Sequence, residues 1–180
     1  GRGFRMTREF DFAVGRTNPE TFPVERLQAA AHAAIAGEYA AITNYHGRLG
    51  HPGLRAAMAR RETEREGVEV DPELISLMNG SMQAVTLTAE ALTRPGDVVI
   101  CEEFTYGGTI GAYRTLEIDM VGLPIDEDGM RVDLLDAKLK ALGETRKPKF
   151  IYALTTYQNP SGTVMSRDRR LQLIDVAARN

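Results

Sequence analysis

The sequence is poor in cysteine, histidine and tryptophan. It contains no tryptophan and one cysteine, Cys101, which excludes an intrachain disulfide. Because Cys101 follows the apolar run 98–100, we expect a small buried strand residue in a reducing compartment rather than a reactive thiol. The three histidines, His32, His46 and His51, lack metal-ligand spacing with any cysteine or carboxylate cluster, so no metal site is predicted.

Long apolar runs and an excess of positive charge are also missing. No run approaches the length that crosses a bilayer, and no hydrophobic core follows residues 1–10 to make a signal peptide. The formal net charge is −3 and the pI about 5.7, so no overall field favours a nucleic acid. Neither a dinucleotide fingerprint nor a Gly-Lys-Ser/Thr motif occurs. We therefore expect a cytoplasmic protein that binds small molecules and has no nucleic-acid or membrane partner.

Apolar runs and amphipathic stretches alternate from Pro72 onward. Strands are predicted at 74–78, 98–101, 118–122 and 150–154, and helices at 82–93, 107–116 and 132–142. This order is typical of βαβ units, so it predicts an α/β fold with a mostly parallel sheet flanked by helices.

The first 70 residues lack this alternation. One helix is predicted from Pro23 to about Gly37, packing on the domain surface or on a partner, and a second from Pro52 to Gly67. The sequence thus predicts an N-terminal arm with helices at 1–70 and the first part of an α/β domain at 71–180. Because no strand follows a last helical pattern at 169–178, the chain is expected to be part of a longer polypeptide.

Gly80 and Ser81 lie between a predicted strand and a predicted helix. At such a helix start the free amides of Ser81 and Met82 and the Ser81 hydroxyl can converge on an anion, which indicates a phosphate site. The alternative is that Ser81 only caps the helix and Gly80 only relieves a tight turn.

Two further polar loops follow predicted strands. Tyr106 precedes two glycines that let a flat ring approach the backbone, and a tyrosine can stack on such a ring. Asn159 offers a donor and an acceptor suited to a phenolic oxygen, and Pro160, which is compatible with a cis peptide, fixes the turn. The alternatives are an ordinary half-buried tyrosine and a plain Asn-Pro-Ser-Gly turn. Together with Gly80-Ser81, these loops favour a phosphate-bearing cofactor with a polar ring.

In this order the motifs resemble the class I and II aminotransferases of fold type I, which use pyridoxal 5'-phosphate (PLP). The resemblance covers nearly the whole chain and rests on Phe12-Ala13-Val14-Gly15, Asn44-Tyr45 with Gly50 and Leu54-Arg55, Asn79-Gly80-Ser81-Met82-Gln83, Thr105-Tyr106-Gly107-Gly108 and Gln158-Asn159-Pro160-Ser161-Gly162. The branch it is most similar to contains 2-aminoadipate, aromatic and kynurenine transaminases, together with the aminotransferase-like domain of some winged-helix regulators.

The resemblance implies that the chain is a truncated aminotransferase-like large domain that binds PLP. It makes Ser81 and Met82 phosphate contacts, Tyr106 the ring stacker and Asn159 the partner of the pyridoxal hydroxyl. Met82 replaces a glutamine that is frequent in the family, but a backbone contact survives that change.

The resemblance also implies a homodimer with sites at the subunit boundary. In it Tyr45 reaches the phosphate bound by the neighbouring subunit. Gly15 lies in a loop that closes over the amino-acid substrate, so Gly15 and Asn159 are the residues expected at the substrate. Val14 stands where the family more often has a small residue.

The catalytic lysine of this family is not recognisable in the sequence. PLP withdraws electrons from the substrate α-carbon, a lysine forms a Schiff base with it, and a carboxylate keeps its pyridine nitrogen charged. None of the four lysines, Lys138, Lys140, Lys147 and Lys149, has the Ser/Thr-rich lead-in expected. The resemblance places both groups beyond Asn180, so this segment alone is expected to be inactive.

The leading hypothesis is therefore a PLP-dependent aminotransferase acting on an α-amino acid and a 2-oxo acid. One alternative is an aminotransferase-like effector domain of a winged-helix transcription regulator, although residues 1–10 are too short to form the winged helix. Another is a PLP-dependent carbon-sulfur lyase, which shares the same cofactor residues. If the 180 residues are the entire natural product, a cofactor-binding or vestigial domain is expected.

Overall fold

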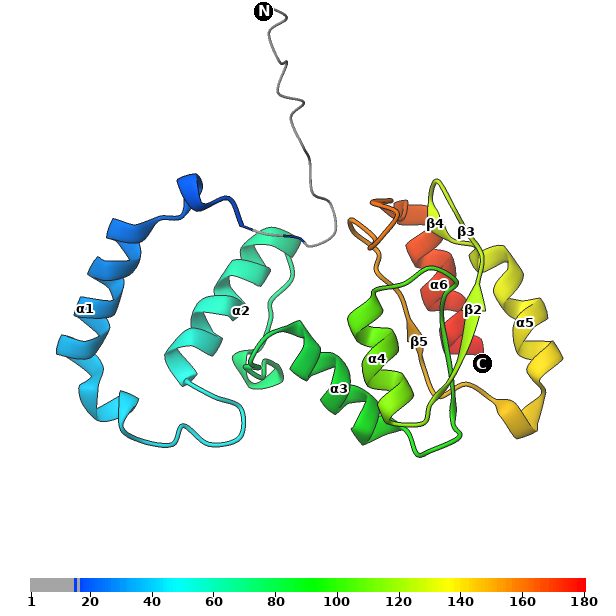
Figure 1. Cartoon of the computed structure of the whole chain (residues 1–180), viewed down its shortest axis with the longest axis horizontal. Helices are drawn as coiled ribbons and strands as arrows, with labels where there is room; N and C mark the ends of the chain where they lie inside the picture. The colour runs from blue at the N-terminus through cyan, green and yellow to red at the C-terminus, as the bar shows by residue number, and fades with distance from the viewer. Residues whose placement is uncertain (1–14, 16) are drawn as a thin grey trace, which may run out of the picture. The chain divides into compact units, whose positions relative to one another are not determined.

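The computed structural model describes residue 15 and residues 17–180. The chain divides into two compact units, Gly1–Leu77 and Met78–Asn180, and both are drawn in Figure 1. The described part of the first unit is helical, and the second contains a parallel sheet. Among the described residues, no helix is long and apolar enough to cross a membrane.

The first helix of the first unit, α1 (Val24–Ile42), follows the short 3₁₀ turn η1 (Pro19–Thr21). It runs past its predicted end near Gly37, but Glu38 has a non-helical backbone with φ −126° and ψ 23°. Glycine therefore marks an interruption rather than the end of the helix. No residue of α1 is buried within this unit.

The second helix, α2 (Pro52–Glu66), has the predicted bounds. His51 caps its start, because its Nδ1 accepts a hydrogen bond from the Leu54 amide at 3.2 Å, and Gly67 ends it with φ 69°. Arg55 is 6% exposed and donates to the carbonyl of Pro72 in the following 3₁₀ turn, η2 (Pro72–Leu74). This contact holds η2 against α2.

The prediction of a strand at 74–78 is wrong. Leu74 ends η2, and Ile75 is extended with φ −104° and ψ 126°, yet no strand of the described residues pairs with it. The Leu77 amide instead donates to the Leu49 carbonyl at 3.0 Å. Apolar alternation favours an extended backbone, but a strand also needs a partner, which the local sequence does not supply.

The second unit contains a three-stranded parallel sheet in the order β2-β1-β5. The central strand β1 (Val98–Glu102) is buried along its whole length, between β2 (Asp119–Leu123) and β5 (Ile151–Tyr152). The strands predicted at 98–101 and 118–122 are therefore confirmed. The strand predicted at 150–154 is present, but only two of its residues pair with β1.

Helices pack on both faces of this sheet: α3 (Ser81–Leu92) and α4 (Gly107–Thr115) on one face, and α5 (Leu135–Leu142) and α6 (Arg167–Arg179) on the other (Figure 1). Because successive strand residues point to opposite faces, Val99 packs with Tyr113 of α4. Ile100 packs with Leu135 of α5 and Val176 of α6. The helix predicted at 132–142 begins as a 3₁₀ turn, η3 (Val132–Leu134), before α5.

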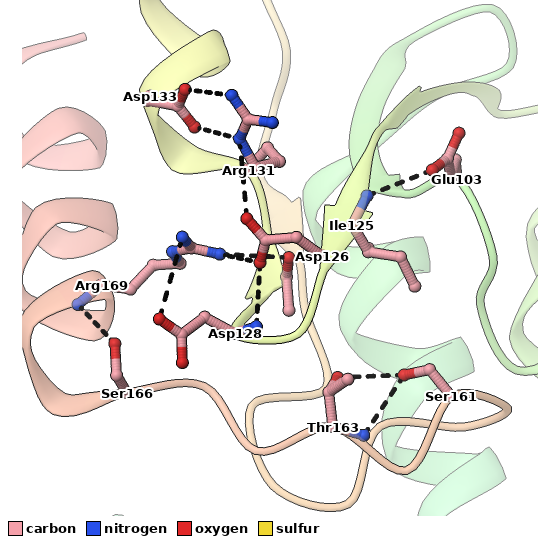
Figure 2. A network of polar contacts seen from close by, with 11 residues as sticks. Glu103, Ile125, Asp126, Asp128, Arg131, Asp133, Ser161, Thr163, Ser166 and Arg169 are labelled. Carbon is pink, nitrogen blue, oxygen red and sulfur yellow. Dashed lines mark hydrogen bonds and ion pairs between the residues drawn. The ribbon is translucent and has the colours of Figure 1, made fainter.

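A short antiparallel hairpin, β3 (Ile125–Asp126) and β4 (Gly129–Met130), follows β2 and was not predicted. Figure 2 shows Arg169 of α6 pointing at the hairpin, where its guanidinium pairs with Asp126 and lies 3.9 Å from a carboxylate oxygen of Asp128. A second arginine, Arg131, lies 3.7 Å from Asp126. Arg169 thus ties the hairpin to α6, and Arg131 adds a charge contact next to β4.

Candidate functional site

The candidate site lies at the carboxyl ends of β1 and β5. The two strands are parallel, so these ends lie at the same edge of the sheet. The loop after β1 carries Tyr106, and the loop after β5 carries Asn159. In open α/β sheets this edge is where ligands bind.

The α3 N-terminus has the backbone of an anion site. Gly80 is the N-cap residue with φ 84°, and no side chain caps the helix there. The amides of the first helical turn have no intrahelical partner, so those of Ser81 and Met82 can donate to an anion. The capping alternative for Ser81 is therefore wrong. The side chain of Gln83 bonds to the loop before the helix, because its Oε1 accepts a hydrogen bond from the Asn79 amide at 2.6 Å.

Tyr106 and Met82 meet at Gly108. A Cβ built on Gly108 would lie 2.5 Å from Cε1 of the Tyr106 ring and 2.9 Å from Sδ of Met82. Only a residue without a side chain lets the starts of α3 and α4 come together in this way. Tyr106 is 40% exposed, so its ring remains accessible. Two of the residues predicted to hold the cofactor are thus neighbours in space.

The turn after β5 presents Asn159 at the surface. The peptide bond between Asn159 and Pro160 is cis, and Asn159 is exposed while Gln158 beside it is 1% exposed. The Gln158 Nε2 donates to the Phe104 carbonyl at 2.6 Å, and its Oε1 accepts from the Ser161 amide at 2.8 Å. The turn is therefore anchored from inside while Asn159 faces outward.

A comparison with known proteins identifies the family. The family model described as "Aminotransferase class I and II" matches residues 10–180. The chain belongs to this family. The aromatic-amino-acid aminotransferase 1 of Thermococcus litoralis is 35% identical over 167 residues, which is 92% of this chain and 40% of that protein.

A solved aminotransferase has the same fold. The crystal structure of the Pyrococcus horikoshii kynurenine aminotransferase, in complex with PMP and KYN as substrates and KYA as products, matches with a TM-score of 0.83 and 32% identity. The match covers 90% of this chain and 40% of that one, so the chain spans about 40% of the length of these relatives. The aminotransferase-like α/β fold predicted from the motifs is confirmed.

A regulatory protein is also similar to this aminotransferase-family chain. The probable rhizopine catabolism regulatory protein MocR of Rhizobium meliloti is 31% identical over 140 residues, covering 77% of this chain and 27% of that protein. The similarity to regulators that was expected from the sequence is therefore found over most of this chain.

Glu102, the last residue of β1, is a site residue that was not predicted from the sequence. It is 1% exposed, and its Oε2 accepts hydrogen bonds from Gln158 Nε2 at 3.1 Å and from the Leu154 amide at 3.3 Å. Burial raises the pKa of this carboxyl, while the bonds from Gln158 and Leu154 oppose that rise. A carboxylate directly after the apolar run 98–101 was the signal that could have identified it.

Cys101 is buried in β1, as predicted for a structural residue. Burial is the main cause that raises the pKa of its thiol, and the neighbouring Glu102 adds to it. A buried thiol with a raised pKa is a poor nucleophile. The prediction that Cys101 has a packing role is therefore consistent with its environment.

Gly15 and Tyr45 belong to the first unit. Tyr45 is fully exposed in the loop before α2, and Gly15 is exposed as well. Residues 12–14, which carry the motif before Gly15, lie outside the described residues. The predicted contacts of Tyr45 with a phosphate and of Gly15 with the substrate stay predictions.

The lysines lie elsewhere in the second unit. Lys138 and Lys140 are on α5, and Lys147 and Lys149 precede β5, at the opposite end of that strand from Asn159. A cleft of about 460 Å³ is lined by apolar residues of α5, α6 and the start of β5 together with Lys147 and Lys149, and it contains none of the predicted site residues. Among the described residues, no group of three or more His, Cys, Asp or Glu side chains could hold a metal ion.

Proposed function

We propose that the protein to which this chain belongs is a PLP-dependent aminotransferase that moves an amino group between an α-amino acid and a 2-oxo acid. The observation that carries this proposal is the convergence of Met82 and Tyr106 on Gly108, beside an α3 N-terminus with free amides. Phosphate and ring are the two parts of PLP that such a pair of helix starts can hold.

The residues present fit that cofactor. Ser81 and Met82 hold the phosphate through their amides, Tyr106 stacks on the ring, and Asn159 bonds the pyridoxal hydroxyl. Tyr45 of a second subunit reaches the same phosphate in a cytoplasmic homodimer, and Gly15 and Asn159 lie next to the substrate. PLP, when bound, withdraws electrons from the substrate α-carbon.

We further propose that residues outside this chain complete the site. The two aminotransferases named above are about two and a half times as long as the matched region, since the chain spans 40% of their length. The Schiff-base lysine and the carboxylate at the pyridine nitrogen come from that remaining part. Residues 71–180 then form the first part of the cofactor-binding domain, and residues 1–70 form its helical arm.

The test uses the full-length protein. Adding PLP should produce an absorption band that shifts when an amino-acid donor is added. Borohydride reduction followed by peptide mapping should place the modified lysine outside Lys138, Lys140, Lys147 and Lys149. A full-length protein without such a band, or one modified at any of these four lysines, would contradict the proposal.

The similarity to MocR supports one other candidate, a regulator whose aminotransferase-like domain binds PLP. The presence of a DNA-binding segment in the full-length protein, with PLP-dependent DNA binding and no transamination, would favour this candidate.

A carbon-sulfur lyase would release a keto acid in the absence of an amino acceptor, which an aminotransferase does not do catalytically.

A further inference from the structure

We propose that Gln158 and Glu102 position Asn159 relative to Tyr106 and so set the shape of the ring-binding part of the cofactor site. The inference rests on the proposed function, because it concerns the same site. Both side chains are 1% exposed and act through their neighbours. They are therefore positioning residues and not catalytic ones.

Gln158 uses the full hydrogen-bonding capacity of its amide. Nε2 donates to the Phe104 carbonyl at 2.6 Å and to Glu102 Oε2 at 3.1 Å. Oε1 accepts from the amide of Ser161 at 2.8 Å and from its hydroxyl at 2.6 Å. A glutamine amide has two donor hydrogens and two acceptor lone pairs, so none is left over.

These partners stand next to the two ring-binding residues. Phe104 is two residues before Tyr106, and Ser161 is two residues after Asn159. One buried side chain therefore fixes both loops, although Asn159 itself remains exposed. If these hydrogen bonds are removed, Gln158 no longer links the two loops. The distance between Tyr106 and Asn159 is then no longer set.

Glu102 adds a second tie between the strand ends. Its Oε2 accepts from the Leu154 amide, two residues beyond β5, as well as from Gln158. Its Oε1 has no hydrogen-bond partner among the described residues. The contribution of Glu102 is thus an acceptor at one oxygen, and a neutral side chain of the same shape can supply it.

Three variants separate the positioning role of these side chains from their burial. Glu102→Gln keeps an oxygen acceptor, whereas Glu102→Leu removes it, and Gln158→Leu removes the whole amide. In the full-length protein titrated with PLP, we expect Gln158→Leu and Glu102→Leu to raise the Kd for PLP about tenfold. Glu102→Gln should stay within about threefold of wild type.

The bound cofactor gives a readout that a purely structural role does not move. The pH midpoint of the PLP absorption band should change in Gln158→Leu, because Asn159 no longer meets the ring hydroxyl in the same position. Glu103→Leu is the matched control: Glu103 is the exposed neighbour of Glu102, and it bonds the Ile125 amide of the hairpin instead. Its Kd and pH midpoint should equal those of wild type.

The outcomes distinguish this inference from the proposed function. A folded Gln158→Leu protein with wild-type Kd and pH midpoint overturns the inference, and so does a loss of affinity in Glu102→Gln as large as in Glu102→Leu. If wild type itself shows no PLP band, the proposed function fails. The contact between the loops is then read from hydrogen exchange of the Ser161 amide, which Gln158→Leu should speed about tenfold and Glu103→Leu should leave unchanged.

Discussion

The Cα of Gly108 lies so close to the ring of Tyr106 that a Cβ there would come within 2.5 Å of Cε1. The same Cβ would come within 2.9 Å of Sδ of Met82. Atoms that are not bonded to each other do not approach so closely. A side chain at position 108 therefore has to displace the tyrosine ring, the thioether or both.

Gly108→Ala should therefore weaken PLP binding by about tenfold or more, with overpacking that costs about 1–3 kcal/mol of unfolding free energy. Titration with PLP and urea unfolding measure the two effects. Gly111→Ala is the control in the same helix, because nothing lies within 4 Å of a Cβ at Gly111. It should not weaken PLP binding, and equal losses in both variants would contradict the predicted role of Gly108.

Arg169→Met should loosen the hairpin from α6. Arg169 pairs with Asp126 and holds the pKa of that carboxyl below its usual value of 3.8. At pH 7 we expect a loss of about 1 kcal/mol in unfolding free energy, measured with urea. Arg167→Met, at an exposed position of the same helix, should cost less.

The pH dependence of this loss has a defined sign. A carboxyl whose folded pKa is lowered stabilises the protein above pH 3.8, and that stability is lost as the pH falls through the folded pKa. The difference between wild type and Arg169→Met should therefore shrink below pH 3.8. A difference that stays constant from pH 7 to pH 3 would show that the ion pair with Asp126 is not its source.

Leu135→Ala should be strongly destabilising. Leu135 is fully buried in the core formed with Ile100 and Val176, so its truncation should cost about 2–5 kcal/mol in urea unfolding. Its neighbour Leu134 is 37% exposed, and Leu134→Ala should cost about 1 kcal/mol or less. Similar costs at the two positions would contradict the core described for this face of the sheet.

Tyr113 should make the protein sensitive to alkali. Burial, with smaller effects of Tyr152 and Cys101, raises the pKa of Tyr113 from 10.0 to about 12. The unfolded chain ionises first, so the stability present below pH 10 is lost as the pH rises towards 12. As the pH rises from 9 to 11.5, the free energy of unfolding should fall less in Tyr113→Phe than in wild type. Urea denaturation at each pH measures this fall. An identical pH dependence would mean that the Tyr113 phenol does not carry this effect.

Elements with local start and stop signals were predictable from the sequence. Pro52 and Gly67 bound α2 because proline suits the first helical turn and glycine adopts the left-handed end conformation, here with φ 69°. The central strand 98–101 was predictable because an apolar run of this length is typical of a strand covered on both faces. These signals act within a few residues of the element.

Elements that depend on distant partners were not predictable. The segment 74–78 has a strand-like pattern but pairs with no described strand. The hairpin at 125–130 is too short to give a periodic signal, and it is held by Arg169, which is 43 residues away from Asp126. In both cases the outcome depends on what lies alongside, which a local pattern does not encode.

The sequence by itself determined the helices with caps, the buried strands, the helix start at Ser81 and the loops that carry Tyr106 and Asn159, because each depends on neighbouring residues. Only the tertiary structure decided which side chains meet: Met82 and Tyr106 at Gly108, and Gln158 with Glu102 across 56 residues of sequence. The physical reason is that the pairing of parallel strands brings distant loops to one edge of the sheet. Gln158 and Glu102 are buried there, away from water, and therefore form hydrogen bonds with protein groups, including each other.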